Sequence, residues 1–95
     1  MSGAAILLVE DDPTLGASLA QRLRLEGYAP RWVRTAKEAA AALRSARYAL
    51  CLCDMRLPDG SGEELLRRLL PEVGALPVIA MTAFGGVEQA VRLMR

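Results

Sequence analysis

Three apolar runs of the chain each lead into residues that can do chemistry. These residues are Glu10, Asp11 and Asp12 after the first run, Asp54 after the second, and Thr82 after the third. Short apolar runs without alternation are typical of strands buried on both faces, as in a parallel sheet. Such sheets bind ligands at the carboxyl ends of their strands. Carboxylates gathered there repel one another unless a cation lies between them, so the pattern predicts a magnesium-dependent phosphoryl site.

Asp54 is the candidate nucleophile of that site. A carboxylate that ends a buried strand is fixed at its base and exposed at its tip, and it can attack phosphorus to form an acyl phosphate. Glu10 and Asp11 would hold Mg²⁺ (or Mn²⁺), which prefers oxygen ligands. The alternative for any one of these acids is a turn or a helix cap. Asp12, followed by Pro13, fits that alternative.

Composition narrows the classes of protein. Ninety-five residues, 53% of them hydrophobic, predict a single domain over residues 1–95. A net charge of +1 gives no reason to expect direct binding of nucleic acid. We see no apolar run long enough to cross a membrane and no secretory signal. Cys51 and Cys53 are the only cysteines and the chain has no histidine, which favours two buried thiols in the cytoplasm over a metal site.

Strands and helices are expected to alternate along the whole chain. The expected strands are residues 5–9, 28–33, 49–53 and 77–81, and the expected helices begin near Pro13, Ala36, Glu63 and Val87. Alternation of this kind implies right-handed βα units, and therefore an α/β fold with an open, doubly wound parallel sheet.

Local signals support several of these elements. Pro30 cannot donate to a sheet ladder, so its strand is expected at an edge. Thr35 and Glu38 match a capping box at the start of the second helix. Apolar stripes are expected on the helices; they comprise Leu15, Leu19 and Leu23 in the first, Ala36, Ala39, Ala40 and Leu43 in the second, and Leu65, Leu66, Leu69 and Leu70 in the third. Pro71 and Gly74 are expected to close the third helix.

Three segments together resemble the receiver domain of bacterial two-component response regulators. They are residues 9–13, 53–62 and 78–83, in the order that the family shows. Residues 82–91 are most similar to receivers of enhancer-binding transcriptional activators. The resemblance implies a flavodoxin-like (CheY-like) fold, with strand order 2-1-3-4-5 in the complete family. It also implies a cytoplasmic signalling domain, not an enzyme, that accepts a phosphoryl group from a histidine kinase.

The resemblance also implies roles for individual residues. Asp54 is similar to the phosphoacceptor, and Asp11 to the acid that binds Mg²⁺ directly, with Glu10 acting mainly through a bound water. The backbone carbonyl of Arg56 resembles the remaining protein ligand. Thr82 resembles the switch hydroxyl. Ala83 resembles the small residue that leaves the site open, and Phe84 is expected to shape access to it.

The chain departs from the family pattern near its end. The family carries a lysine at the end of a fifth strand, whereas the single lysine here, Lys37, falls on the second helix. The fifth strand and fifth helix have no counterpart, so we expect an incomplete receiver of order 2-1-3-4 without its output domain. Weaker phosphorylation is expected without the lysine. An exposed fourth strand, residues 78–81, is expected to promote self-association.

Two other classes of function are alternatives to a phosphoacceptor domain. A truncated or degenerate receiver could act as a dimerisation or protein-interaction module that needs no phosphorylation. A phosphatase with a strand-end Asp nucleophile is disfavoured, because such enzymes need a second Asp two residues further on, where this chain has Arg56. Trp32 and Tyr28 are interpreted as packing residues.

Overall fold

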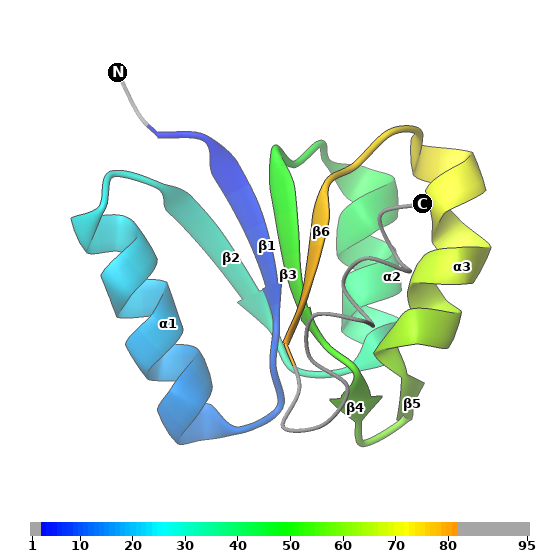
Figure 1. Cartoon of the computed structure of the whole chain (residues 1–95), viewed down its shortest axis with the longest axis horizontal. Coiled ribbons are helices and arrows are strands. Elements are labelled where there is room, and N and C mark those ends of the chain that lie inside the picture. The colour runs from blue at the N-terminus through cyan, green and yellow to red at the C-terminus, as the bar shows by residue number, and fades with distance from the viewer. Residues whose placement is uncertain (1–2, 82–95) are drawn as a thin grey trace.

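The computed structural model describes residues 3–81, which form a four-stranded sheet flanked by three helices. The strands β1 (Ala5–Val9), β2 (Ala29–Val33), β3 (Leu50–Asp54) and β6 (Val78–Met81) are all parallel and lie in the order β2-β1-β3-β6. This confirms the expected fold class and the expected order 2-1-3-4, in which β6 is the fourth strand. The helix α1 (Pro13–Leu25) covers one face, and α2 (Ala36–Ser45) and α3 (Gly62–Val73) cover the other (Figure 1).

The strand boundaries agree with the sequence to within one residue. The first strand is found where it was predicted, and the second, third and fourth each begin one residue later. The third strand also extends to Asp54, so this carboxylate is carried by the last residue of β3. Pro30 lies in β2 opposite Ile6, at an outer edge of the described sheet, as its missing N–H predicts.

Capping groups start the helices. Asp12 caps α1 by accepting the N–H groups of Thr14 (2.9 Å) and Leu15 (3.2 Å). Thr35 caps α2 by accepting the N–H of Glu38 at 3.0 Å. The predicted box is modified, because the Glu38 carboxylate accepts the N–H of Arg34 (3.2 Å), where a capping box would use that of Thr35.

The third helix begins after Ser61 and continues through Pro71 to end at Gly74. Ser61 is its N-cap, and Glu63 and Glu64 lie in its first turn, where negative charge is favourable. The helix continues two residues beyond Pro71 and ends at Gly74, whose φ of 81° is a conformation that glycine adopts readily. Gly74 therefore ends the helix as predicted, and Pro71 does not. The helix expected from Val87 lies outside the described residues.

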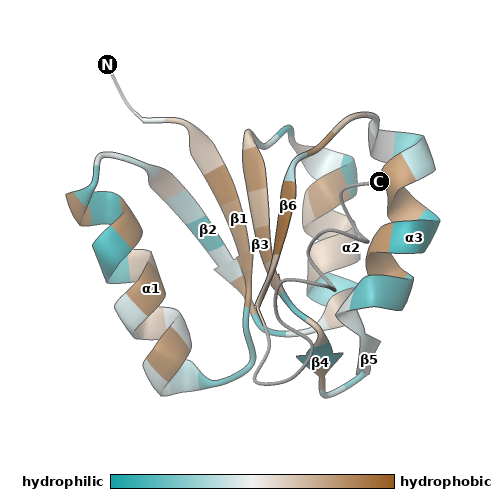
Figure 2. Ribbon diagram, viewed as in Figure 1, coloured by the Kyte–Doolittle hydropathy of each residue, from teal (hydrophilic) through white to brown (hydrophobic). Residues whose placement is uncertain are grey.

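The main core lies between the sheet and the pair α2 and α3. Its members are buried and apolar; they include Leu7, Val9, Cys51, Cys53, Ala39, Leu43, Leu65, Leu66, Leu69 and Val78. Figure 2 shows the apolar residues concentrated along the central strands and on the inner sides of these helices. Both cysteines are free and buried. A hydrogen bond to Cys51, together with burial, raises the pKa of Cys53, so this thiol stays neutral.

The face under α1 is less completely buried. Leu15 is 45% exposed, and Leu19 and Leu23 are half-buried, so the predicted stripe exists but is only partly covered. On β6, Ile79 is 47% exposed. No helix within residues 3–81 is both long and apolar enough to cross a membrane.

Candidate functional site: an acidic cluster at the carboxyl ends of β1 and β3

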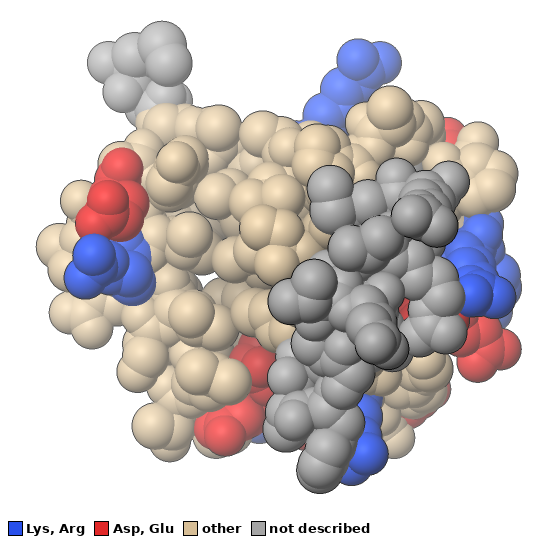
Figure 3. All heavy atoms as spheres, viewed as in Figure 1, with Lys and Arg blue, Asp and Glu red and all other residues tan. Residues whose placement is uncertain are grey.

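The structure brings together three of the predicted site carboxylates. Glu10 and Asp11 directly follow β1, and Asp54 ends β3, which lies next to β1. One carboxylate oxygen from each of the three residues lies within 4.8 Å of the other two. Acidic side chains are visible at this edge of the molecule, below the sheet and beside the start of α1 (Figure 3). Parallel strands with a common direction place their carboxyl ends together, which explains the cluster.

Glu10 is the most buried member of the cluster, with 3% of the residue exposed. Its carboxylate accepts the backbone N–H of Asp12 at 3.0 Å, which favours the charged form. Burial outweighs this bond, and the neighbouring charges of Asp54 and Asp11 add to burial, so the pKa of Glu10 is raised above its ordinary value. The charged form of Glu10 therefore costs free energy in the folded protein, and a bound cation would remove this cost.

The cluster lines an open hollow with mixed chemistry. Its walls are formed by residues of the β1–α1 and β3–α3 connections, the first turns of α1 and the end of β6; they are Glu10, Asp11, Asp12, Leu15, Leu19, Asp54, Arg56, Leu57, Pro58, Ala80 and Met81. Carboxylates, one arginine and apolar side chains all contribute to its lining. A small anion held by a cation at the carboxylates could enter this hollow from solvent.

Asp54 and Arg56 are tied together in one turn. The N–H of Arg56 donates to the Asp54 carboxylate at 3.0 Å. Arg56 and Leu57 form β4 (Arg56–Leu57), which pairs antiparallel with β5 (Gly60–Ser61), so a short hairpin connects β3 to α3. The hairpin determines where the backbone of Arg56, the predicted carbonyl ligand, lies relative to Asp54.

Three of the predicted site residues, Thr82, Ala83 and Phe84, lie outside the described residues. Their neighbour Met81 pairs in register with Asp54, and its carbonyl accepts the N–H of Met55 at 3.2 Å. Lys37, the single lysine, lies in the first turn of α2, as predicted.

Asp59 contributes a contact that the sequence analysis missed. Its carboxylate accepts the N–H groups of Ala36 (2.7 Å) and Lys37 (3.0 Å), which lowers its pKa. This bond ties the β4–β5 hairpin to the start of α2. A partner 23 positions away leaves no local pattern from which this contact could be predicted.

Gly62 is required by the close approach of α3 to the end of β3. A Cβ atom on Gly62 would lie 2.3 Å from the carbonyl oxygen of Asp54 and 2.9 Å from the sulfur of Cys53. Such distances are shorter than van der Waals contact, and the carbonyl belongs to the residue that carries the candidate nucleophile. Only glycine fits between these two elements.

We expect Gly62→Ala to lower the free energy of unfolding by about 1–3 kcal/mol, as overpacking does in other cores. Urea denaturation followed by circular dichroism measures this change. Arg68→Ala, at an exposed position of the same helix, is the control and should change stability by no more than about 0.5 kcal/mol. Equal stability of Gly62→Ala and the parent would show that α3 does not approach Asp54 this closely.

The donor set fits a hard divalent cation. Three carboxylates, one of them buried with a raised pKa, offer oxygen atoms and no sulfur or imidazole. The backbone carbonyl of Arg56 is carried by the hairpin that follows Asp54. The residues present therefore suit Mg²⁺ or Mn²⁺ better than they suit zinc.

A parallel sheet of order 2-1-3-4 with acids at its carboxyl edge defines a flavodoxin-like α/β domain. The chain belongs to the response regulator receiver domain family, whose model matches residues 6–95. The chain is 37% identical over 92 residues to the response regulator protein FleR of Pseudomonas aeruginosa, and 35% identical over 95 residues to PilR of the same organism. These matches cover 97% and 100% of the chain, which spans about a fifth of each relative (20% and 21%).

Solved structures agree with this assignment. The receiver domain of HemR from Leptospira biflexa is 37% identical, with a TM-score of 0.84 over 94% of this chain and 72% of that one. The response regulator TrrA from Thermotoga maritima, solved in complex with Mg²⁺ and BeF, is 28% identical, with a TM-score of 0.81 over 90% of this chain and 72% of that one. Receiver domains are signalling domains of two-component systems. They interact with histidine kinases and bind Mg²⁺ at an acidic pocket.

Proposed function

We propose that this domain accepts a phosphoryl group on Asp54 from a phosphohistidine of a histidine kinase, with Mg²⁺ at the acidic cluster. The observation that carries the proposal is the approach of the Glu10, Asp11 and Asp54 carboxylate oxygens to within 4.8 Å of one another. In the transfer, the phosphorus–nitrogen bond of the donor breaks, and a bond forms between phosphorus and an Asp54 oxygen. Mg²⁺, when bound, would neutralise charge on the phosphoryl oxygens.

Each residue of the cluster has a distinct proposed task. Asp11 binds the cation directly and Glu10 acts mainly through a water, while Asp54 contributes one oxygen to the cation and the other to phosphorus. The carbonyl of Arg56 completes the protein ligands. The Mg²⁺–BeF complex of the TrrA relative supports a site of this kind. Thr82, Ala83 and Phe84 keep the roles that the family implies: a switch hydroxyl, a small residue that leaves the site open, and a residue that shapes access.

The signal would pass to an output domain outside this chain. Several relatives are transcriptional regulatory proteins. One of them is PmrA of Pectobacterium parmentieri, to which the chain is 42% identical over 86 residues; the match spans 39% of the length of PmrA. We therefore infer a role in transcriptional regulation, exerted through that output domain and not by nucleic-acid binding of this domain. Two free buried thiols fit a cytoplasmic location.

Phosphorylation by a small donor tests the proposal directly. Labelled phosphoramidate contains the same phosphorus–nitrogen bond as phosphohistidine, so no cognate kinase is needed. We expect label to enter the protein only when Mg²⁺ is present, and hydroxylamine to release it, since acyl phosphates are cleaved by this nucleophile. Absence of label at saturating donor and Mg²⁺, in protein whose fold is verified, would refute the proposal.

A second candidate function is self-association through β6. Within residues 3–81, β6 is hydrogen-bonded to β3 alone and its Ile79 is 47% exposed, which favours pairing with another chain. This function would not require phosphorylation. It therefore corresponds to the interaction module that the sequence left open.

We expect a dimer in light scattering at micromolar concentration and a shift to monomer in Ile79→Lys, because a charge on an edge strand opposes pairing. Leu25→Lys is the matched control, since Leu25 is 75% exposed on α1, away from β6, and should leave the dimer intact. A monomeric parent protein would remove this second candidate and leave the phosphoacceptor proposal unaffected.

A further inference from the structure

Two side chains from the end of β2 and the residue just beyond it hold consecutive carbonyls of the acidic cluster. The indole N–H of Trp32 donates to the carbonyl oxygen of Glu10 at 2.8 Å. The guanidinium of Arg34 donates to the carbonyl oxygen of Asp11 through Nη2 at 2.8 Å and through Nε at 3.2 Å. These two peptide groups carry the two acids that β1 supplies to the cluster. We call this pair of contacts the β2 latch.

The β2 latch completes the restraint of a short turn. The N–H of Glu10 donates to the carbonyl of Val33 at 3.0 Å, and the N–H of Asp12 donates to the Glu10 carboxylate at 3.0 Å. With the two latched carbonyls, most backbone groups from Glu10 to Asp12 have a partner. Fixed peptide planes fix the directions of the Cα–Cβ bonds of Glu10 and Asp11. The latch therefore restricts the region that the two carboxylates can reach.

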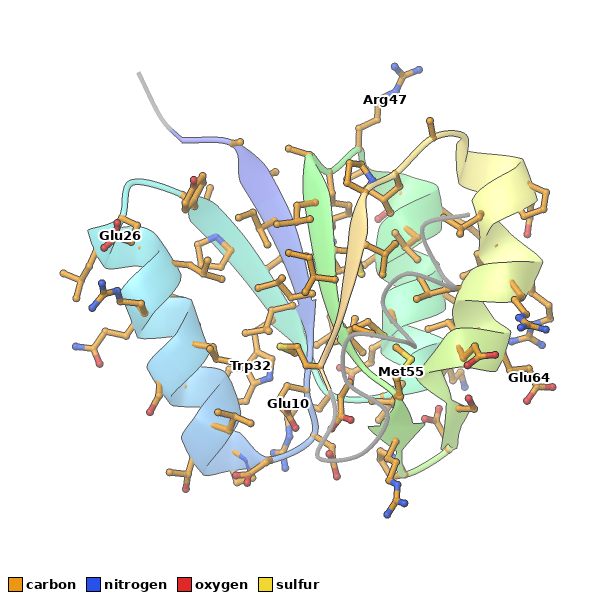
Figure 4. All side chains as sticks on the ribbon, viewed as in Figure 1. Glu10, Glu26, Trp32, Arg47, Met55 and Glu64 are labelled. Atoms are coloured by element: carbon orange, nitrogen blue, oxygen red, sulfur yellow. The ribbon has the colours of Figure 1, made fainter. Side chains whose placement is uncertain are left out.

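Trp32 is itself held in place by the first helix. A Cβ on Gly16 would lie 2.2 Å from the ring atoms Cε2 and Cζ2 of Trp32 and 2.5 Å from its Nε1, so the indole lies directly against the α1 backbone. Figure 4 shows the Trp32 side chain between α1 and the sheet, next to Glu10. Trp32, predicted from the sequence to be a packing residue, also places a donor beside the acidic cluster.

Three carboxylates in close proximity repel one another, and an unrestrained turn would relax by separating them. In other metal sites, mutation of the residues that orient the ligands lowers the affinity for the metal about 10–100-fold. We propose that Trp32 and Arg34 are positioning residues that hold Glu10 and Asp11 in a cation-ready arrangement and thereby set the affinity for a divalent cation. This inference rests on the proposed function, because it concerns the same cluster.

Manganese binding tests the latch. Free Mn²⁺ is counted by electron paramagnetic resonance, a readout that needs neither phosphorylation nor tryptophan fluorescence. We expect Trp32→Phe, which keeps a ring and loses the N–H, and Arg34→Met, which keeps the stem and loses the donors, each to weaken Mn²⁺ binding about tenfold. Arg31→Met is the matched control and should bind like the parent, since Arg31 lies on the same strand and its guanidinium contacts the Tyr48 hydroxyl at 3.4 Å.

A further variant separates positioning from general packing. Gly16→Ala should displace the indole and weaken Mn²⁺ binding as much as Trp32→Phe does, although it changes no group that touches an acid. The indole N–H of the metal-free protein should also lose its protection from hydrogen exchange in this variant. The affinities for Mn²⁺ are compared at a temperature at which circular dichroism shows that each variant is folded. Because Arg34 is exposed, Arg34→Met is the variant least at risk of unfolding.

The possible results separate the proposed function from the role of the latch. A parent protein that binds no Mn²⁺ overturns the proposed function, and the latch with it. A parent that binds Mn²⁺, with folded Trp32→Phe and Arg34→Met variants that bind equally well, overturns the latch and leaves the proposed function standing. Weaker binding in both variants, with the Arg31→Met control unchanged, supports the latch.

Discussion

Replacement of Asp54 by Asn is expected to abolish incorporation of label from phosphoramidate, because an amide cannot supply the oxygen that bonds to phosphorus. The fold is retained, since Asn is close in size and its Oδ1 can still accept the N–H of Arg56, which lies 3.0 Å from the Asp54 carboxylate. The loss is expected to be complete, as it removes the group that forms the bond. Label release by hydroxylamine from the parent alone is the measurement that checks it.

Asp12→Asn is the charge-matched control for this prediction. Asp12 lines the same hollow but caps α1, and Asn is an equally good capping residue. The control should therefore accept label at close to the parental level. Label that persists in Asp54→Asn would show that the phosphoacceptor lies elsewhere. Label that disappears equally in Asp12→Asn would show that the loss is not specific to Asp54.

Glu10→Gln is expected to stabilise the metal-free protein and to remove part of its pH dependence. The pKa of Glu10 is raised in the folded state, mainly by burial, so the folded chain binds more protons than the unfolded chain at pH values just above 4.5. The contribution of Glu10 to the stability of the parent must then fall as pH rises through that window. Each unit of the raised pKa corresponds to about 1.4 kcal/mol, and an uncharged amide avoids this cost.

Urea denaturation without metal, repeated from pH 4.5 to pH 7.5, measures the effect. The gain in Glu10→Gln should be largest near neutral pH and shrink toward the acidic end, where the unfolded state also begins to bind a proton on this carboxylate. Leu25→Gln, at an exposed position of α1, is the control and should follow the pH profile of the parent. A variant that is less stable than the parent at neutral pH would show that the charged form of Glu10 is favoured in the fold.

Apolar runs and the residues after them were sufficient to predict the sheet and the clustered acids. Each run ends within one residue of the end of a strand, and parallel strands must bring Glu10, Asp11 and Asp54 to a common edge. The third strand ends one residue later than predicted because its ladder with β6 continues. The β3 ladder continues through Asp54, which pairs with Met81.

Contacts between distant loops could not be predicted in the same way. Arg34 reaches the carbonyl of Asp11 from 23 positions away, and Asp59 reaches the start of α2 over a similar separation. Such contacts depend on how the loops approach one another in the folded chain, and single polar residues in loops carry no period that reveals them. Gly62 stood in a recognisable motif, but its reason, the nearby carbonyl of Asp54, is visible only in three dimensions.

The central claim is that two acids after β1 and one at the end of β3 jointly bind a divalent cation. A titration with Mg²⁺, followed residue by residue through amide nuclear magnetic resonance, tests it most directly. We predict saturable shifts that centre on residues 10–12 and 54–56 and that vanish in Asp11→Asn. Shifts that are absent at high Mg²⁺, or that persist unchanged in Asp11→Asn, would contradict the claim.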